Sequence, residues 1–362
     1  MMKHVFVLAM ASMVYNLVGQ DIAKTVNPIQ AITTRWSDEQ AQQWSRENGW
    51  LRGCNFNPST AINQLEMWQS DTFDPVTIDR ELGWAQEIGM NAMRVYLHHV
   101  AWKVDKEGLK SRMNTYLSIA HKHKIKTIFC IFDDCWNSTY KAGQQPEPKP
   151  GVHNSGWLQD PGDLLYSDST LVNTLEAYVK DILTTFKDDH RIVMWDLYNE
   201  PGNTKLGNKS LPLLKKVFEW GWKVRPSQPL SSGKWDASLK EISNFQVEFS
   251  DIITYHHYGS PDKHQAYIDD LKKYNRPLVC TEYMARPNKS LFSNIMPILK
   301  KQNIGAINWG LVAGKSNTKY AWDKPILDGS EPQLWFHEIF HPNGKPYKHD
   351  EIDLIKSLTT IP

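Results

Sequence analysis

The 362-residue chain contains only four cysteines and has no surplus of charge of either sign. The cysteines form no Cys-x-x-Cys pair and no His/Cys ligand spacing, so we expect no metal site and no cofactor. Lys and Arg number 41 against 40 Asp and Glu, and both signs are mixed along the chain. This balance excludes a polyanion-binding surface, and with it a nucleic-acid partner. No internal repeat or low-complexity linker indicates a second folded domain.

The N-terminus has the pattern of an export signal. A short basic start at residues 1–4 precedes a nearly uncharged apolar run at residues 5–18. The run is too short to cross a bilayer comfortably, so we expect no membrane span. An amphipathic or buried first helix is the alternative. We therefore predict a secreted or periplasmic protein with a signal peptide at 1–20, a leader segment at 21–45 and one domain at 46–362.

Eight short β-like runs alternate with helical patterns along the rest of the chain. Such alternation is typical of a parallel sheet. The runs cover residues 51–57, 91–97, 126–134, 192–200, 229–233, 252–258, 277–283 and 305–312. Eight βα units predict an α/β fold, the (β/α)8 TIM barrel. A doubly wound open sheet is the alternative, although no Gly-rich nucleotide loop follows the first run.

The connections between these runs have helical spacing, with one exception. Helices are predicted over residues 76–88, 113–123, 170–186, 211–224, 263–274 and 290–301. Residues 134–168 form a connection too long for an ordinary βα turn, and they carry four prolines and several aromatic residues. Because this segment leaves the carboxyl end of the third run, we predict that it walls the functional site. The tail at 331–362 is predicted to be a last helical region.

Two of the runs deliver a glutamate to their carboxyl ends. Glu200 is followed by Pro201, which cannot donate a ladder hydrogen bond and so ends its strand. Glu282 ends the seventh run. An ion pair or a helix N-terminus would explain one such glutamate, but two across a barrel mouth favour chemistry. Retaining glycoside hydrolysis uses two carboxylates roughly 5–5.5 Å apart. The 15 Trp suit sugar rings too, although most tryptophans fill cores.

The motifs around these glutamates resemble those of clan A glycoside hydrolases, most closely the family 5 cellulases and mannanases. They read WDLYNEP at 195–201 and CTEY at 280–283, and the resemblance runs from about Trp50 onward. It implies a retaining β-glycoside hydrolase that acts on a carbohydrate by double displacement. Glu200 would be the acid/base and Glu282 the nucleophile, with Asn199 on the sugar 2-hydroxyl.

The resemblance extends to other strand ends. It implies that Arg94 holds the nucleophile ionised, although a core salt bridge would also explain a strand arginine. It maps a His-x-Tyr motif onto His256 and Tyr258, whose hydroxyl would contact the nucleophile, and His257 would then point away. Trp309 matches the tryptophan that floors the cleavage subsite, or else it is a core residue.

The chain departs from the family pattern at the third strand. Family 5 enzymes usually have a histidine there, whereas this chain has Asp133, Asp134 and Trp136. Either aspartate could bind a sugar diol, or cap a helix. His98, beside His99 after the second run, is assigned to sugar contact or structural support, because adjacent strand residues point in opposite directions and no third metal ligand is evident.

Three other functions remain open at this point. A catalytically silent carbohydrate-binding barrel would not need two glutamates. A transglycosylase would use the same scaffold and the same intermediate. A metal-dependent barrel hydrolase would need a ligand pair at the first strand, where the sequence reads GCNF at 53–56. The sugar, the linkage, endo or exo action and the oligomeric state do not follow from the sequence.

Overall fold

The computed structural model describes residues 35–360, so the predicted signal peptide lies outside the described part. Eight parallel strands are hydrogen-bonded in the order β5-β4-β3-β2-β1-β8-β7-β6. A bridge between Lys234, just after β5, and Tyr255 in β6 brings the two ends of this order together. The predicted (β/α)8 barrel is thereby confirmed. The strands are β1 (Arg52–Asn55), β2 (Ala92–Tyr96), β3 (Lys126–Asp133), β4 (Ile192–Asn199), β5 (Leu230–Ser231), β6 (Ile253–His256), β7 (Leu278–Glu282) and β8 (Gly305–Trp309).

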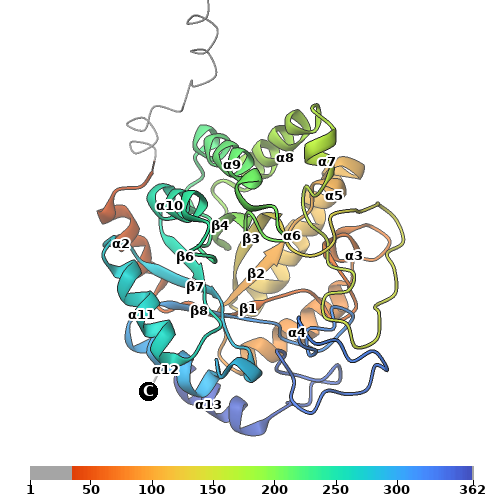
Figure 1. The fold of residues 1–362 in the computed structure, drawn as a ribbon, viewed down its shortest axis with the longest axis vertical. Helices are drawn as coiled ribbons and strands as arrows, with labels where there is room; N and C mark the ends of the chain where they lie inside the picture. Colours follow the sequence, from red (N-terminus) through yellow and green to blue (C-terminus); the bar gives the residue numbers. More distant parts are fainter. Residues whose placement is uncertain (1–34, 361–362) are drawn as a thin grey trace, which may run out of the picture. The chain divides into compact units, whose positions relative to one another are not determined.

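Helices surround the strands on the outside, as Figure 1 shows. All six predicted helices are present within a few residues, except that the second begins earlier. The helices are α2 (Asp38–Asn48), α3 (Gln64–Trp68), α4 (Pro75–Glu87), α5 (His99–Val104), α6 (Lys106–Lys122), α7 (Leu164–Ser167), α8 (Leu171–Phe186), α9 (Leu211–Val224), α10 (Lys240–Phe249), α11 (Pro261–Lys272), α12 (Phe292–Lys301) and α13 (His349–Thr359). No helix of the described residues is long and apolar enough to cross a membrane.

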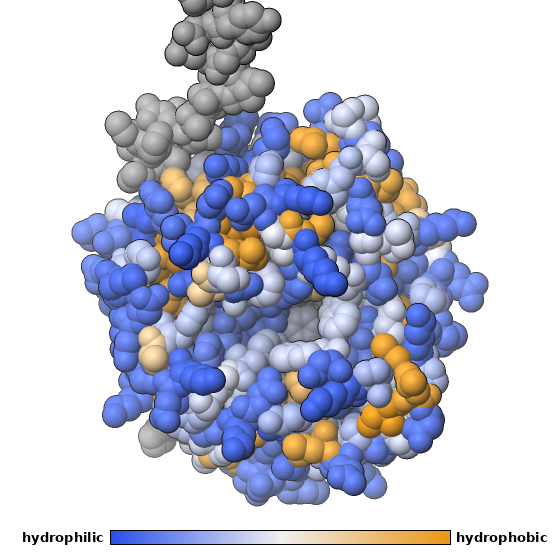
Figure 2. Space-filling model, viewed as in Figure 1, coloured by the Kyte–Doolittle hydropathy of each residue, from blue (hydrophilic) through white to orange (hydrophobic). Residues whose placement is uncertain are grey.

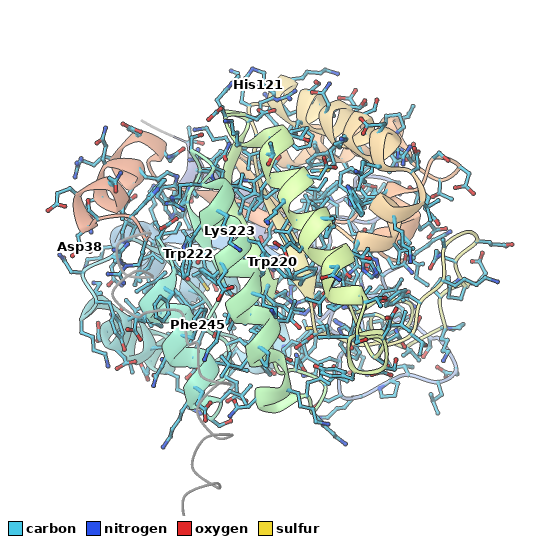
Figure 3. All side chains as sticks on the ribbon, turned by 90° about the horizontal axis from the view of Figure 1, so that it is seen from above. Asp38, His121, Trp220, Trp222, Lys223 and Phe245 are labelled. Atoms are coloured by element: carbon cyan, nitrogen blue, oxygen red, sulfur yellow. The ribbon has the colours of Figure 1, made fainter. Side chains whose placement is uncertain are left out.

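The strands form because their residues are apolar on both faces. Every residue of β2, β4, β6 and β7 is buried. Strands covered on both sides read as continuous apolar runs rather than alternating ones. Helices α9 and α10 contact each other through aromatic rings, with those of Phe218 and Phe245 5.4 Å apart (Phe245 is labelled in Figure 3).

One end of the barrel is closed by α2. Its Ala41 and Trp44 pack with apolar side chains of several strands, and Trp44 Nε1 donates to the Val193 carbonyl oxygen at 3.0 Å. The helix begins with a capping box at Ser37. The predicted boundary between leader and domain at 45/46 therefore falls inside a helix that packs on the barrel.

Two long loops lie side by side at the other end (Figure 1). The first connects β3 to α7, and the second follows β8. Their backbones are joined by hydrogen bonds from Asn154 N to Ser316 O at 2.9 Å and from Ile326 N to Gly151 O at 3.0 Å. The tail predicted to be helical over 331–362 is helical only in α13. Its earlier residues belong to the second loop, where the Trp335 ring stacks on Tyr347 with 4.4 Å between centroids.

Candidate active site

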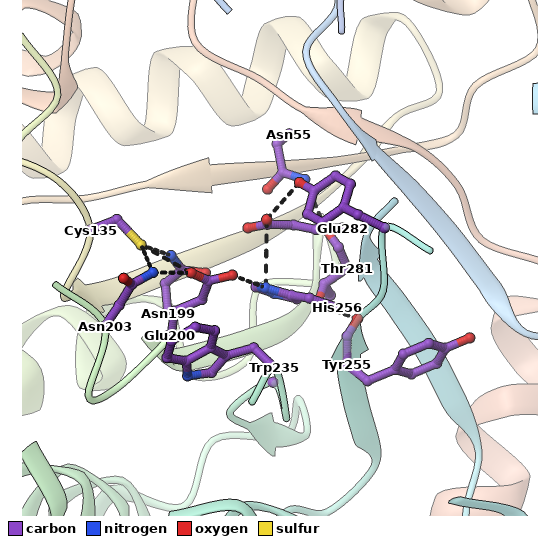
Figure 4. A network of polar contacts seen from close by, with 12 residues as sticks. Asn55, Cys135, Asn199, Glu200, Asn203, Trp235, Tyr255, His256, Thr281 and Glu282 are labelled. Carbon is purple, nitrogen blue, oxygen red and sulfur yellow. Dashed lines mark hydrogen bonds and ion pairs between the residues drawn. The ribbon is translucent and has the colours of Figure 1, made fainter. Parts of the chain in front are cut away.

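Glu200 and Glu282 meet at the carboxyl end of the barrel. Glu282 is the last residue of β7, and Glu200 follows β4 with a φ of 43°, which turns the chain out of the strand. With His256 at the end of β6 they form a cluster in which one carboxylate oxygen of each glutamate and a ring nitrogen all lie within 4.8 Å of one another. The strands thus bring the two predicted catalytic carboxylates to one point, shown in Figure 4.

Three side chains hold Glu282 through hydrogen bonds. Arg94 Nη1 donates to Oε1 at 3.0 Å and the Tyr96 hydroxyl donates to the same oxygen at 3.1 Å. The Tyr258 hydroxyl donates to Oε2 at 2.8 Å. Donors to both oxygens favour the ionised carboxylate.

Arg94 is fully buried in β2 and joins several groups of the site. Its guanidinium forms an ion pair with Asp196 at 2.8 Å and donates to Oδ1 of Asn55 and of Asn199, both at 2.7 Å. A buried charge is costly unless it is paired, and here two carboxylates pair with it. Arg94 therefore fixes both Glu282 and Asn199.

Glu200 has a different set of neighbours. His256 Nδ1 lies 2.7 Å from Oε1, the Cys135 thiol donates to Oε2 at 3.3 Å, and Asn203 Nδ2 donates to Oε2. Burial raises the pKa of Glu200, but these hydrogen bonds and the charge of His256 outweigh it and leave the pKa below its ordinary value.

The pKa values of the other two members of the cluster, Glu282 and His256, are raised rather than lowered. Burial raises the pKa of Glu282, and the Glu200 carboxylate adds to this effect, against the opposing charges of His256 and Arg94. Burial alone would lower the pKa of His256, but the two carboxylates leave it above its ordinary value. In this arrangement the proton shared by His256 and Glu200 resides on His256.

A cavity of about 690 Å³ opens above the cluster, visible as a hollow near the middle of the face in Figure 2. Aromatic rings and short polar side chains line it in about equal number. The lining residues are Cys135, Trp136, Asn137, His153, Asn154, Asn199, Glu200, Asn203, Thr204, Trp235, His256, His257, Tyr258, Glu282, Trp309, Trp322 and His337.

Most of the predicted site residues border this cavity. Trp136, which has a φ of 73° and is 38% exposed, lies on its wall with Tyr258 and Trp309. His257 also borders it, but its ring packs on His264 and Tyr267, at 4.7 and 5.3 Å between centroids.

The two aspartates after β3 do not line the cavity. Asp134 accepts from the Tyr198 hydroxyl at 2.6 Å, from Gly202 N at 2.7 Å and from Ser210, so it holds the loop after β4. Asp133 accepts from Asn199 Nδ2 at 2.9 Å and so supports a residue of the site from behind. Their acceptor positions are occupied by protein donors rather than offered to a ligand.

His98 also lies away from the cavity. It is fully buried, its Nδ1 accepts from Val100 N at 3.2 Å, and its Nε2 donates to the Gln159 carbonyl oxygen at 3.1 Å. The neighbouring His99 contacts Asp160 through its Nδ1. His98, His99 and Asp160 are residue types that can bind a metal ion, and one ligand atom of each lies within 4.8 Å of the others. The lone pair of His98 is already used, however, so we assign the group to structural support.

Several residues of the cavity were not found by the sequence interpretation. Cys135 follows the third strand and Asn203 follows the Asn-Glu-Pro motif, and neither belongs to a motif that points to the site. His153, Trp322 and His337 come from the two long loops. The aromatic content of the first loop was a signal for His153, whereas nothing in the sequence placed the second loop over the barrel.

A family model of the glycosyl hydrolases family 2 TIM barrel domain matches residues 162–303, a segment that contains both glutamates. The chain resembles a clan A glycoside hydrolase. This match confirms the expected enzyme class, a glycosidase that hydrolyses O-glycosyl compounds. No curated protein matches the chain.

Solved structures share this clan A fold at low sequence identity. GH5_18 from Streptomyces cattleya in complex with GlcNAc is 11% identical, with a TM-score of 0.58 over 86% of this chain and 79% of that one. The exo-β-1,4-mannosidase Op5Man5 from an Opitutaceae bacterium is 17% identical, with a TM-score of 0.59 over 86% and 60%. The endo-1,4-β-mannanase from Rhizomucor miehei is 14% identical, with a TM-score of 0.56 over 86% and 94%.

Proposed function

We propose that the protein is a retaining β-glycoside hydrolase in which Glu282 is the nucleophile and Glu200 the acid/base. The supporting observation is the separation of the two carboxylates, which have oxygens within 4.8 Å of one another. Retaining enzymes hold the two groups about 5–5.5 Å apart, whereas inverting enzymes need about 6.5–9.5 Å to admit water between them.

The proton that the acid must deliver can be held between Glu200 and His256. Moving it from His256 Nδ1 to Glu200 Oε1, across 2.7 Å, gives a neutral imidazole and a protonated Glu200 without changing the total charge. The transfer removes both the charge of His256, which lowers the pKa of Glu282, and the charge of Glu200, which raises it, so Arg94 and Tyr258 are left to favour the ionised form of Glu282. This is the protonation state that attack on an anomeric carbon requires.

Asn199 is placed to recognise the sugar. Its Oδ1 is fixed by Arg94 at 2.7 Å, and its Nδ2 donates to Asp133 at 2.9 Å and to the Cys135 sulfur, a weak acceptor that a sugar hydroxyl can replace, at 3.4 Å. We assign Nδ2 to the 2-hydroxyl, a contact that strengthens in the transition state. Trp309, at the end of β8, borders the same cavity and forms the floor for the ring in this proposal.

β-Mannosides are our first choice of substrate. Support comes from the names of the similar structures, which include an exo-β-1,4-mannosidase, an endo-1,4-β-mannanase and a GH5_18 variant in complex with Manβ1-4GlcNAc. We also propose that residues 1–20 direct export, and that the catalytic domain includes α2 because this helix closes the barrel.

The test is a comparison of wild type with Glu282→Ala on aryl β-mannosides and on β-1,4-mannan. We expect hydrolysis by the wild type only, with azide restoring part of the turnover of the aryl substrate as an external nucleophile. Glu87→Ala, an exposed change on α4, is the control and should leave activity unchanged. Full activity of Glu282→Ala would contradict the proposal.

A further inference from the structure

The end of the cavity between the two long loops is built from side chains that the proposed mechanism does not use. His153 and Asn154 come from the loop after β3, and Trp322 and His337 come from the loop after β8. The His153 and His337 rings lie 5.6 Å apart, and Trp322 lies 5.8 Å from His337. All four residues line the cavity.

Backbone contacts fix the tautomer of both histidines. His153 Nδ1 lies 2.8 Å from the Tyr320 carbonyl oxygen, and His337 Nδ1 lies 2.7 Å from the Met284 carbonyl oxygen. A carbonyl oxygen only accepts, so each Nδ1 carries a hydrogen. Burial lowers the pKa of His153 to about 4 and holds the pKa of His337 well below its ordinary value. At neutral pH each ring therefore has an Nε2 with a lone pair and no hydrogen.

Asn154 provides an independent observation. It is 1% exposed, and its Oδ1 is buried without a hydrogen-bond partner among the described residues. Burying an acceptor without a partner costs about 1–3 kcal/mol. Because Asn154 lines the cavity, a small rotation of its amide would offer this oxygen to a ligand hydroxyl and remove the cost.

The charges around the cavity define the class of ligand. Among the described residues that line it there is no lysine and no arginine, and its two ionisable carboxyl groups are those of Glu200 and Glu282. The positive charge of His256 is already paired with Glu200, so a carboxylate or sulfate on a ligand would find no free opposite charge there. Trp136 and Trp322 supply flat apolar faces instead, with Trp136 5.2 Å from His153.

We infer that His153, Asn154, Trp322 and His337 form a sugar subsite that accepts hydrogen bonds from hydroxyl groups and selects uncharged sugar residues. The inference rests on the proposed function and adds the substrate class, neutral β-linked oligosaccharides rather than uronic-acid polymers. Tyr258 places the subsite on the nucleophile side. Its hydroxyl donates to Glu282 at 2.8 Å, and its ring lies 5.0 Å from Trp322 and 5.7 Å from His337.

The test measures binding rather than turnover, so it is separate from the test of catalysis. Calorimetry on the full chain carrying Glu282→Gln compares β-1,4-mannotriose and cellotriose with the trimer of β-1,4-linked mannuronic acid, which differs from mannotriose only in its C6 carboxylates. We expect a neutral trisaccharide to bind at least about tenfold more tightly than the uronate. Binding of the uronate as tightly, or of neither neutral trisaccharide, would overturn the inference.

Substitutions of His337 separate hydrogen bonding from packing. In His337→Asn the amide can still donate to the Met284 carbonyl oxygen, but the acceptor at Nε2 is lost, so we expect Kd for the neutral trisaccharide to rise about 2- to 12-fold. His337→Gln restores a polar atom near Nε2 and should recover part of this loss. His190→Asn, an exposed change after α8, is the control.

Circular dichroism confirms that each variant is folded, and His153→Asn repeats the test on the other loop. Equal Kd values for His337→Asn, His153→Asn and the His190 control would overturn the inference. Loss of azide rescue in Glu282→Ala, with this binding pattern intact, would instead contradict the proposed mechanism alone.

Discussion

In the proposed mechanism, Glu200 and His256 determine the pH range in which the site can act. The pKa of His256 lies above its ordinary value because two carboxylates face it. The pair loses its shared proton only when the pH rises through that raised pKa. The proton is then missing from both groups, and Glu200 has nothing to deliver to the leaving group.

We therefore expect the basic limb of the wild-type kcat/KM profile to lie above about pH 6.5, the ordinary pKa of histidine. Glu200→Gln carries no transferable proton, so the basic limb should flatten. For mannobiose we expect a loss of about 10²–10⁴-fold, and a much smaller loss for a dinitrophenyl glycoside, whose leaving group needs no acid. An unchanged basic limb in the variant would assign the acid role to another residue. Glu87→Gln serves as the control.

The sequence was sufficient to find the residues that end strands. Glu200 and Glu282 end apolar runs, and the structure brings them together because parallel strands end at one rim. Asp133 and Asp134 also follow a strand, yet protein donors surround them. Position along a strand does not show which neighbour a side chain meets across the barrel.

The elements themselves were predictable to the extent that their pattern is local. All eight strands could be predicted from apolar runs, because a strand that is buried on both faces needs apolar residues on both. The helix α2 was missed because it covers the barrel end rather than a sheet face, so few of its residues are apolar. The loop after β8 has no periodicity, and its course depends on hydrogen bonds to residues 151 and 154 far away in the sequence.

This loop also carries a buried carboxyl, that of Glu338, which forms no ion pair among the described residues. Glu338 has a φ of 58° and is 1% exposed; its Oε1 accepts from Thr318, whereas its Oε2 has no partner among the described residues. Burial raises the pKa of Glu338 to about 8, and the buried Glu81 of α4 adds to this shift. The folded protein therefore holds this proton at a pH where the unfolded chain has released it.

Linkage gives the sign of the effect on stability. Between the ordinary pKa of 4.5 and about 8, the folded state binds more protons, so the free energy of unfolding falls as the pH rises and is level above that window. Glu338→Gln removes this slope, and we expect it to raise the free energy of unfolding at pH 9 by about 1–3 kcal/mol. Urea titrations at pH 5 and pH 9 measure both values. Glu241→Gln, an exposed change in α10, is the control, and an equal slope in both variants would contradict the prediction.

At the scale of the whole molecule, the chain shares its fold with the similar proteins at low sequence identity. A family 2 model matches part of the chain, while family 5 structures match its fold at 11–17% identity. The family model and the solved structures both indicate a barrel, and in this chain Glu200 and Glu282 lie at its carboxyl end. In this chain the two long loops close one side of the cavity, and hydrogen bonds between their backbones hold them together.

The stereochemistry of the reaction tests the barrel geometry as a whole. In the proposed mechanism, the ends of β4 and β7 hold carboxylate oxygens within 4.8 Å, which leaves no room for a water between Glu282 and the anomeric carbon, so the sugar passes through a covalent intermediate. Two displacements restore the original configuration. We therefore expect proton NMR to detect the β anomer first when wild-type protein hydrolyses an aryl β-mannoside, before mutarotation supplies the α anomer. In dilute methanol a methyl β-mannoside should accumulate, since methanol competes with water for the same intermediate. First release of the α anomer would require a separation of at least about 6.5 Å, which these two strand ends do not have.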